Sequence, residues 1–201
     1  MRSRLAASQV KFAPCVLAAI ISVLCVANAK ASPVTYTESA TVSGSLNGVS
    51  FTSQLFTITG TGDTTGISGI TNHFVTATFS VTGVGNGSFG VLAVFDNPST
   101  NPAAAGFTDE GFGADILDTF NAAFASYDLR TSIGPITGPS FITKDSSLLT
   151  ALTGEHLSFT SAGDATFTAI VTPLPAALPL FASGLVGLGL LGWRRKRAAA
   201  G

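Results

Sequence analysis

Apolar and hydroxyl side chains alternate along much of the middle of the chain, and this two-residue period is its strongest structural signal. From Val75 to Val81 every second residue is apolar, and the residues between them are threonine or serine. Successive side chains of a β-strand point to opposite faces, so the pattern predicts a strand with one buried face. Similar strand-like stretches occur at residues 34–42, 49–58, 89–95, 157–159 and 165–171.

Glycine-rich segments separate these stretches and predict turns. The dipeptide Asn86-Gly87 is typical of a tight hairpin, and Ala162-Gly163-Asp164 predicts a second turn. Short alternating strands joined by such turns favour a mainly β, antiparallel domain. We expect a β-sandwich, Ig-like or jelly-roll-like, over residues 30–172.

Two segments depart from the alternation. Residues 96–113 are rich in Pro, Asn and Gly and predict a long loop. In residues 114–129, Ile116, Phe120 and Phe124 have helical spacing, and the residues from Tyr127 onward alternate like a strand. We expect a short helix or a loop that leads into a strand.

The N-terminus has the three zones of a secretory signal peptide, residues 1–29. Basic residues precede an uncharged apolar run from Cys15 to Val26, and Ala27 and Ala29 occupy the −3 and −1 positions of a cleavage site before Lys30. Cleavage after Ala31 and retention as an anchor are the alternatives. Both cysteines of the chain lie in this segment, so the mature protein would have no disulfide and no thiolate metal site.

The C-terminus has the layout of a single transmembrane helix. Residues 176–193 contain no charge and would extend ~27 Å as a helix, and Trp193 ends the run. The basic cluster Arg194, Arg195, Lys196 and Arg197 follows directly and is expected to stay in the cytoplasm. Both ends therefore place residues 30–172 outside the cytoplasm, as an ectodomain.

The motif Pro173-Leu174-Pro175-Ala176, the apolar helix 177–193 and the cluster 194–197 together resemble the PEP-CTERM sorting domain, in its VPLPA variant. Leu174 replaces the Glu of the family name, and Thr172 stands where the variant has Val. The resemblance covers residues 173–201 and implies that an exosortase, a membrane-embedded cysteine protease, cuts near the motif. A plain membrane anchor is the alternative.

The resemblance also implies a place for the protein. Such proteins occur in Gram-negative bacteria that make exopolysaccharide and biofilm. The chain would pass through the secretion translocon and stay briefly anchored in the inner membrane, with its ectodomain in the periplasm. It would then reach the cell surface or the medium, where exopolysaccharide is an expected partner.

The ectodomain is acidic, although the whole chain is nearly neutral. All eleven acidic residues lie in 30–172, against the bases Lys30, Arg130 and Lys144, so the net charge there is −8. This excess of acid disfavours nucleic acid as a partner, because binding to phosphates needs Lys and Arg.

The residues needed for catalysis are scarce. His73 and His156 are the only histidines, and the Gly-x-Ser-x-Gly motif of many hydrolases does not occur. The glycines 85, 87 and 90 match a dinucleotide-binding string, but a predicted strand follows them where that motif needs a helix. We expect a non-enzymatic surface or matrix protein; a secreted hydrolase that uses His156 is the alternative.

Acidic residues gather in one segment of the ectodomain. Asp96, Asp109, Glu110 and Asp115, together with Asn97 and Asp118, lie within 23 residues. Calcium prefers such oxygen ligands, so the first four are candidate calcium ligands of an adhesin-like module that binds calcium or carbohydrate. A solvated acidic face is the alternative, and no other metal or cofactor is expected.

Overall fold

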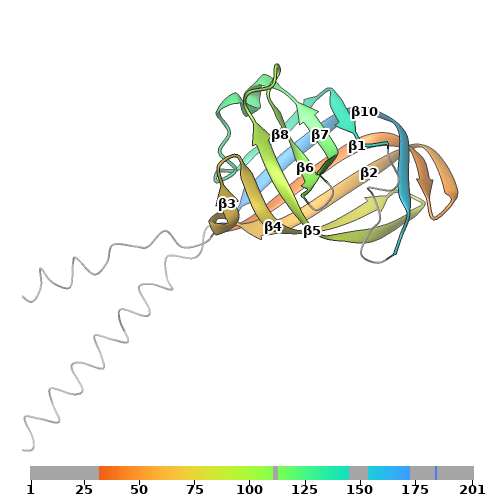
Figure 1. Ribbon diagram of the computed structural model, residues 1–201, viewed down its shortest axis with the longest axis horizontal. Coiled ribbons are helices and arrows are strands. Elements are labelled where there is room, and N and C mark those ends of the chain that lie inside the picture. Colours follow the sequence, from red (N-terminus) through yellow and green to blue (C-terminus); the bar gives the residue numbers. More distant parts are fainter. Residues whose placement is uncertain (1–31, 111–112, 145–153, 173–183, 185–201) are drawn as a thin grey trace, which may run out of the picture. The chain divides into compact units, whose positions relative to one another are not determined.

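The computed structural model describes residues 32–110, 113–144 and 154–172, and Gly184. Figure 1 shows a curled sheet with short connections. Its elements are β1 (Pro33–Leu46), β2 (Val49–Asp63), the 3-10 helix η1 (Thr64–Gly66), β3 (Ile67–Ser68), β4 (Thr71–Val81), β5 (Gly85–Asn97), β6 (Ala104–Asp109), β7 (Ala114–Phe120), the 3-10 helix η2 (Ala122–Ser126), β8 (Ile133–Gly138), β9 (Ser140–Ile142) and β10 (Leu157–Val171).

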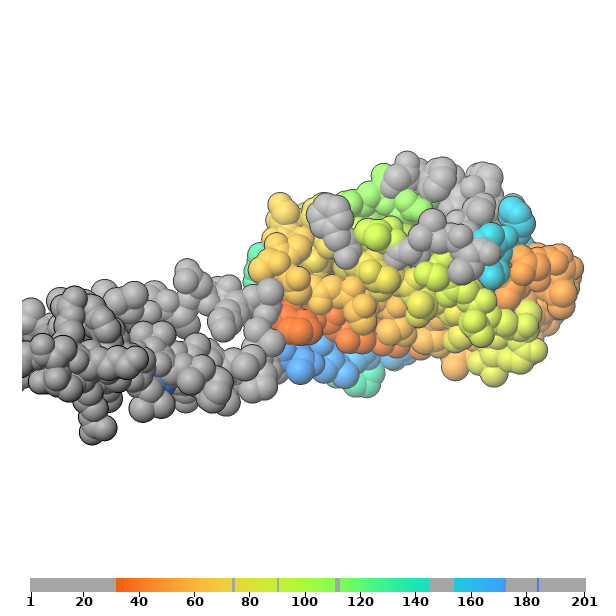
Figure 2. Space-filling model, turned by 90° about the horizontal axis from the view of Figure 1, so that it is seen from below, coloured from red at the N-terminus to blue at the C-terminus, as the bar shows by residue number. Residues whose placement is uncertain are grey.

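All these strands belong to one antiparallel sheet, which confirms the mainly β, antiparallel prediction. The order is β8-β10-β1-β2-β4-β5-β6-β7-β9, and β3 pairs with β4. β1 and β10 come from opposite ends of the described chain but pair from Val34–Val171 to Leu46–Leu157. Figure 2 shows them side by side, β1 in red-orange and β10 in blue.

The sheet is barrel-like and nearly closed, because the segment Ile133–Ile142 reaches both of its ends. We call this segment the closing segment. Its first part, β8, pairs with β10, and its second part, β9, pairs with β7. Between them, the Pro139 carbonyl accepts a hydrogen bond from the Phe120 amide at 2.9 Å.

The predicted β-sandwich, Ig-like or jelly-roll-like, is therefore wrong. Alternation predicts which residues are buried, but one curled sheet and two stacked sheets bury the same alternate residues. Here the strands of 14 and 15 residues carry bulges, which bend strands and let a single sheet curl back on itself.

Aromatic side chains fill the interior of the sheet. The alternating residues of β4 and β10 point inward as predicted: Val75, Ala77 and Phe79 are almost fully buried, and so is Phe167. The largest fully buried side chains are Tyr36, Phe56, Phe107, Phe124 and Phe167. The interior is thus a packed core, which leaves the outer wall as the place for a binding site.

Both predicted turns are wrong. The β4–β5 turn is at Thr82–Val84, where Gly83 has a φ of +73°, and Asn86-Gly87 lies within β5. The segment Ala162–Asp164 is part of β10, where the register against β1 shifts between Val42–Ala162 and Ala40–Ala165. An extra residue on one strand makes a bulge, which has the same glycine-rich composition as a turn.

The alternation predicted for residues 89–95 is interrupted by a bulge. Ala77 pairs with Gly90 but Thr78 pairs with Ser88, so Phe89 is an extra residue in β5. The bulge changes which residues face inward: Phe89 and Leu92 are buried, whereas Val91 is 59% exposed.

The two segments that depart from the alternation are also more ordered than predicted. Residues 96–113 were predicted as a loop but contain strand β6, and residues 114–120 form strand β7 instead of a helix or loop. A short helix does occur, as η2. These strands are rich in Ala, Gly, Asp and Thr, so their own propensity for β structure is weak. Their strand conformation therefore depends on pairing with neighbouring strands.

The predicted terminal segments lie outside the described residues. These are the signal peptide with Ala27 and Ala29, the motif 173–176, the basic cluster 194–197 and the helix 177–193 except for Gly184, which is helical. Within the part that the structure describes, no helix is both long and apolar enough to cross a membrane.

Candidate functional site

Three acidic side chains are buried in the described domain, and two of them face the interior. Glu38 lies on the inward face of β1, where its Oε1 accepts a hydrogen bond from Thr119 Oγ1 at 2.6 Å. Burial raises the pKa of Glu38 well above its usual value, so folding favours the protonated form of this carboxyl. Burial, followed by the charge of Asp128, also raises the pKa of Asp96 to about 7.

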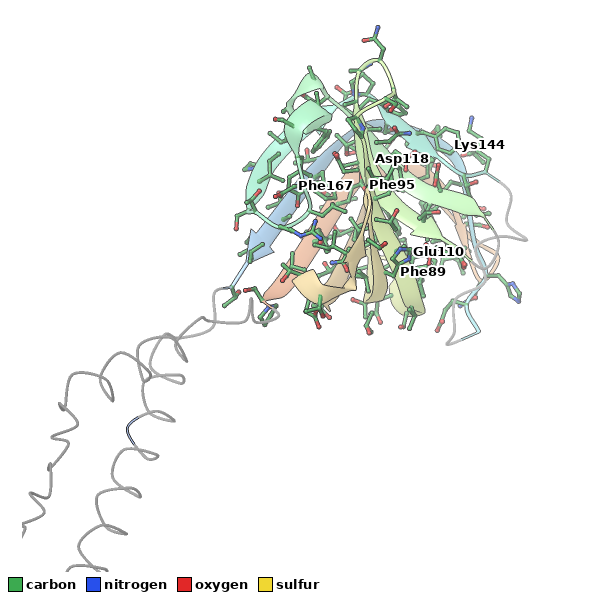
Figure 3. All side chains as sticks on the ribbon, turned by 60° about the vertical axis from the view of Figure 1, so that its left-hand side comes forward. Phe89, Phe95, Glu110, Asp118, Lys144 and Phe167 are labelled. Carbon is green, nitrogen blue, oxygen red and sulfur yellow. The ribbon has the colours of Figure 1, made fainter. Side chains whose placement is uncertain are left out.

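The third buried acid, Asp118, lies on the outer wall in a row of paired residues. Phe95 of β5 pairs with Gly106 of β6, Gly106 pairs with Asp118 of β7, and Asp118 pairs with Phe141 of β9. The row brings together aromatic rings that are far apart in the sequence, with the carboxyl group between them. Figure 3 shows Asp118 close to Phe95.

This row forms part of an open groove of about 230 Å³. We call it the acidic groove, and it is lined by Phe95, Asn97, Thr100, Ala104, Asp115, Asp118, Phe120 and Phe141. Pockets for drug-sized ligands hold about 300–1,000 Å³. The acidic groove is smaller, which suits a single ring of a larger ligand.

Glycine at position 106 leaves room for the Asp118 carboxyl group. A Cβ at this position would lie 2.5 Å from Asp118 Oδ1 and 2.8 Å from Asp118 Cα, closer than real Cβ contacts come. Any larger residue would therefore displace the carboxyl from its place on the wall of the groove.

A β-bulge in β7 brings a second carboxyl to the same wall. Phe107 pairs with Leu117 but Thr108 pairs with Asp115, so Ile116 is an extra residue. In a regular strand, residues 115 and 118 would face opposite sides of the sheet. Because of the bulge, both line the acidic groove.

Asp118 is desolvated and lacks a complete set of partners. Asp118 is only 4% exposed, and its buried Oδ1 has no hydrogen-bond partner. Burial, and then the charge of Asp115, raise the pKa of Asp118 to about 8. The carboxyl is thus mostly protonated at neutral pH, and it can both donate and accept a hydrogen bond.

A second hollow adjoins the acidic groove. It has a volume of about 470 Å³ and is lined by Ser140, Phe141, Ile142, Lys144 and Ala162. Phe141 lines both hollows and is 48% exposed. This exposed ring is the feature that the two hollows share.

The four candidate calcium ligands are not brought together. Asp96 is buried toward the interior and Asp115 lines the outer groove. Glu110 Oε1 lies 2.8 Å from His73 Nδ1, and Figure 3 shows Glu110 well apart from Asp118. In the residues for which the structure gives positions, no three acidic, His or Cys side chains lie close enough to hold a metal ion.

The two histidines occupy separate places. His73 pairs with Glu110, whereas His156 is exposed and its backbone exchanges hydrogen bonds with Asn47. The glycines of the dinucleotide-like string lie within strand β5 itself, and not in the hairpin turn before a strand that the sequence predicted. Neither histidine lines the acidic groove.

Comparisons with protein families, with curated proteins and with solved structures found no match to this chain.

Sequence reasoning found part of this site. It selected the acidic segment that contains Asp115 and Asp118, but it expected a short helix or a loop there and named only Asp115 of the two as a candidate calcium ligand. It missed Phe95, Phe120 and Phe141, because only the pairing of β5, β6, β7 and β9 places them around the carboxyl groups. Apolar residues in a half-exposed strand give no separate signal in the sequence.

Proposed function

We propose that this chain is an exported, exosortase-sorted protein of the cell surface or extracellular matrix, and that its domain binds exopolysaccharide without enzymatic activity. The observation that carries the proposal is the buried, incompletely partnered Asp118 carboxyl beside the exposed ring of Phe141. Pyranose rings stack on aromatic side chains, and carboxyl and amide groups hydrogen-bond their hydroxyls.

The two adjoining hollows support a polymer as the ligand. The acidic groove has room for one ring, and the hollow beyond Phe141 continues the surface toward Lys144. The packed interior of the sheet leaves the outer wall as the place for such a ligand. An exported protein with this surface would remain attached to the polysaccharide that surrounds the cell.

The binding proposal is tested with the purified full chain and a panel of bacterial exopolysaccharides. We expect Phe141→Ala to weaken binding by about fivefold, since a good aromatic contact contributes on the order of 1 kcal/mol. Ile170→Ala is the matched control, because Ile170 is 57% exposed on β10 and lines neither hollow. Equal affinities for the two variants would contradict the proposal.

Sorting is tested separately in cells with and without the exosortase. We expect the mature protein to begin at Lys30 and to lack Trp193 and the basic cluster, as measured by intact mass. In cells without the exosortase, the C-terminal segment should remain. A mature form that retains Trp193 in normal cells would show that the C-terminal segment is a permanent anchor, and it would contradict sorting by the exosortase.

Glycoside hydrolysis is a second candidate function, and one observation favours it. A protonated carboxyl beside a second carboxyl group is the arrangement that glycoside hydrolases use as general acid and base, and Asp118 and Asp115 line one groove. Release of reducing ends that Asp118→Asn and Asp115→Asn both abolish would establish an enzyme. Binding without turnover supports the binding protein.

A further inference from the structure

We propose that the acidic groove is a subsite for a sugar ring that carries a positively charged amino group, as in a polysaccharide with free amino sugars. This inference rests on the proposed function and names the class of sugar that the groove would select. It follows from the charge of the groove, from the incompletely partnered carboxyl and from the rings around it.

The charge of the groove is one-sided. Asp115 and Asp118 line it, and its other lining residues are aromatic or uncharged. Of the two bases in the described residues, Arg130 is engaged with the carbonyls of Asp128 and Ile67, and Lys144 lies in the neighbouring hollow. An acidic sugar would be repelled here, and a cation would be attracted.

A cation also completes the hydrogen bonding of Asp118. Burial makes the ionised form of Asp118 costly, and a charged donor that approaches the carboxyl offsets this cost. An ammonium group supplies three donors, so it can reach both Asp118 and Asp115. The hydroxyls of a neutral sugar could supply the missing hydrogen bond to Asp118 but would leave its carboxyl protonated.

The aromatic residues favour an ammonium group on a ring over an isolated cation. Phe95, Phe120 and Phe141 line the groove around the two carboxyl groups. Aromatic faces attract cations and also stack against the apolar face of a pyranose. Asn97 and Thr100 at the same groove offer polar groups to the ring hydroxyls.

Binding of an ammonium group has a proton signature. Asp118 is protonated in the empty groove at about pH 6, because its pKa is about 8. A bound cation stabilises the carboxylate and lowers this pKa, so Asp118 releases its proton when the ligand binds. A neutral sugar would not cause this release.

The test is calorimetry on the full chain at about pH 6 in buffers of different ionisation enthalpy. The ligands are a β-1,4-linked glucosamine tetramer, its N-acetylated counterpart and a glucose tetramer. We expect the glucosamine tetramer to bind at least roughly tenfold more tightly than the other two, with a heat that depends on the buffer.

Two variants distinguish the effect of the Asp118 carboxyl in the groove from the effect of a carboxyl elsewhere on the domain. Asp118→Asn should lose both the preference for glucosamine and the buffer dependence. Asp63→Asn makes the same carboxyl-to-amide change on β2, outside the groove, and should behave like the natural chain, since its amide oxygen can still accept from the Thr65 amide. Unfolding curves of both variants report whether each is folded.

The possible outcomes distinguish the inference from the proposed function. Equal binding of the three tetramers, or release of no proton, would overturn the amino-sugar inference and leave carbohydrate binding in place. Binding of none of these ligands or of any exopolysaccharide would overturn both. Equally tight binding of a lysine tetrapeptide would assign the groove to cations in general and would also overturn the inference.

Discussion

At the scale of single residues, a buried hydrogen-bond network links distant parts of the chain. The Tyr36 hydroxyl accepts from Asn72 Nδ2 at 2.8 Å and donates to the Leu129 carbonyl at 3.1 Å. Leu129 has a φ of +60°, a conformation that branched and bulky residues rarely adopt. The bond from Tyr36 therefore helps to hold an unfavourable backbone conformation inside the core.

The substitution Tyr36→Phe tests this network. It leaves two buried groups without a partner, so we expect the free energy of unfolding to fall by about 1–3 kcal/mol. Denaturant unfolding of the full chain measures the change. Tyr127→Phe is the matched control, because the buried Tyr127 hydroxyl has no hydrogen-bond partner and its loss should cost little. Similar losses for both variants would contradict the role given to Tyr36.

At the scale of elements, the bulges and the closing segment decide the shape of the sheet. The bulge at Ile116 sets the side on which Asp115 lies, and the bulge at Phe89 sets the inward residues of β5. The closing segment joins β10 to β7 at Gly138, which pairs with Ala165 and approaches the Phe120 carbonyl. Ser140 Oγ adds a hydrogen bond to the Gly163 carbonyl at 2.6 Å.

The substitution Gly138→Ala should open this junction. A Cβ at position 138 would overlap the Phe120 carbonyl, which belongs to the backbone and cannot turn away. We expect a loss of about 1–3 kcal/mol in the free energy of unfolding, the usual cost of overpacking. In Gly163→Ala, the nearest atom to the new Cβ is the Thr41 oxygen at 3.7 Å, so this control should keep its stability.

At the scale of the whole molecule, the buried acids make the folded domain more stable at acidic pH than at neutral pH. The pKa values of Glu38, Asp96 and Asp118 are all raised in the fold. Between about pH 4, where these groups titrate in the unfolded chain, and about pH 8, the folded state binds more protons than the unfolded state. Stability therefore falls as the pH rises through this window. The net charge of −8 on residues 30–172 acts in the same direction.

The substitution Glu38→Gln tests the pH dependence of the full chain. Its amide oxygen can still accept from Thr119, but it has no proton to lose. A carboxyl that stays protonated only in the fold contributes up to about 1.4 kcal/mol per pH unit to the slope of stability. We expect the melting temperature to fall from pH 5 to pH 8 less steeply in the variant. An unchanged slope would contradict a raised pKa of Glu38.

The sequence by itself determined the strands that alternate and the composition of both ends. Val75 to Val81 and Ala165 to Ala169 bury the predicted residues, because a period of two is a local property of the chain. The layout of the terminal segments likewise depends on length and charge alone, and their roles remain predictions.

Tertiary structure alone decided the register, the closure of the sheet and the acidic groove. Pairing between β5, β6, β7 and β9 converts weakly patterned segments into strands and places Phe95, Asp118 and Phe141 in one row. A single bulge moves Asp115 to the face of Asp118. Cross-strand contacts and bulges depend on which strands become neighbours, and that choice is made by packing of the whole core, so no local pattern of residues encodes it.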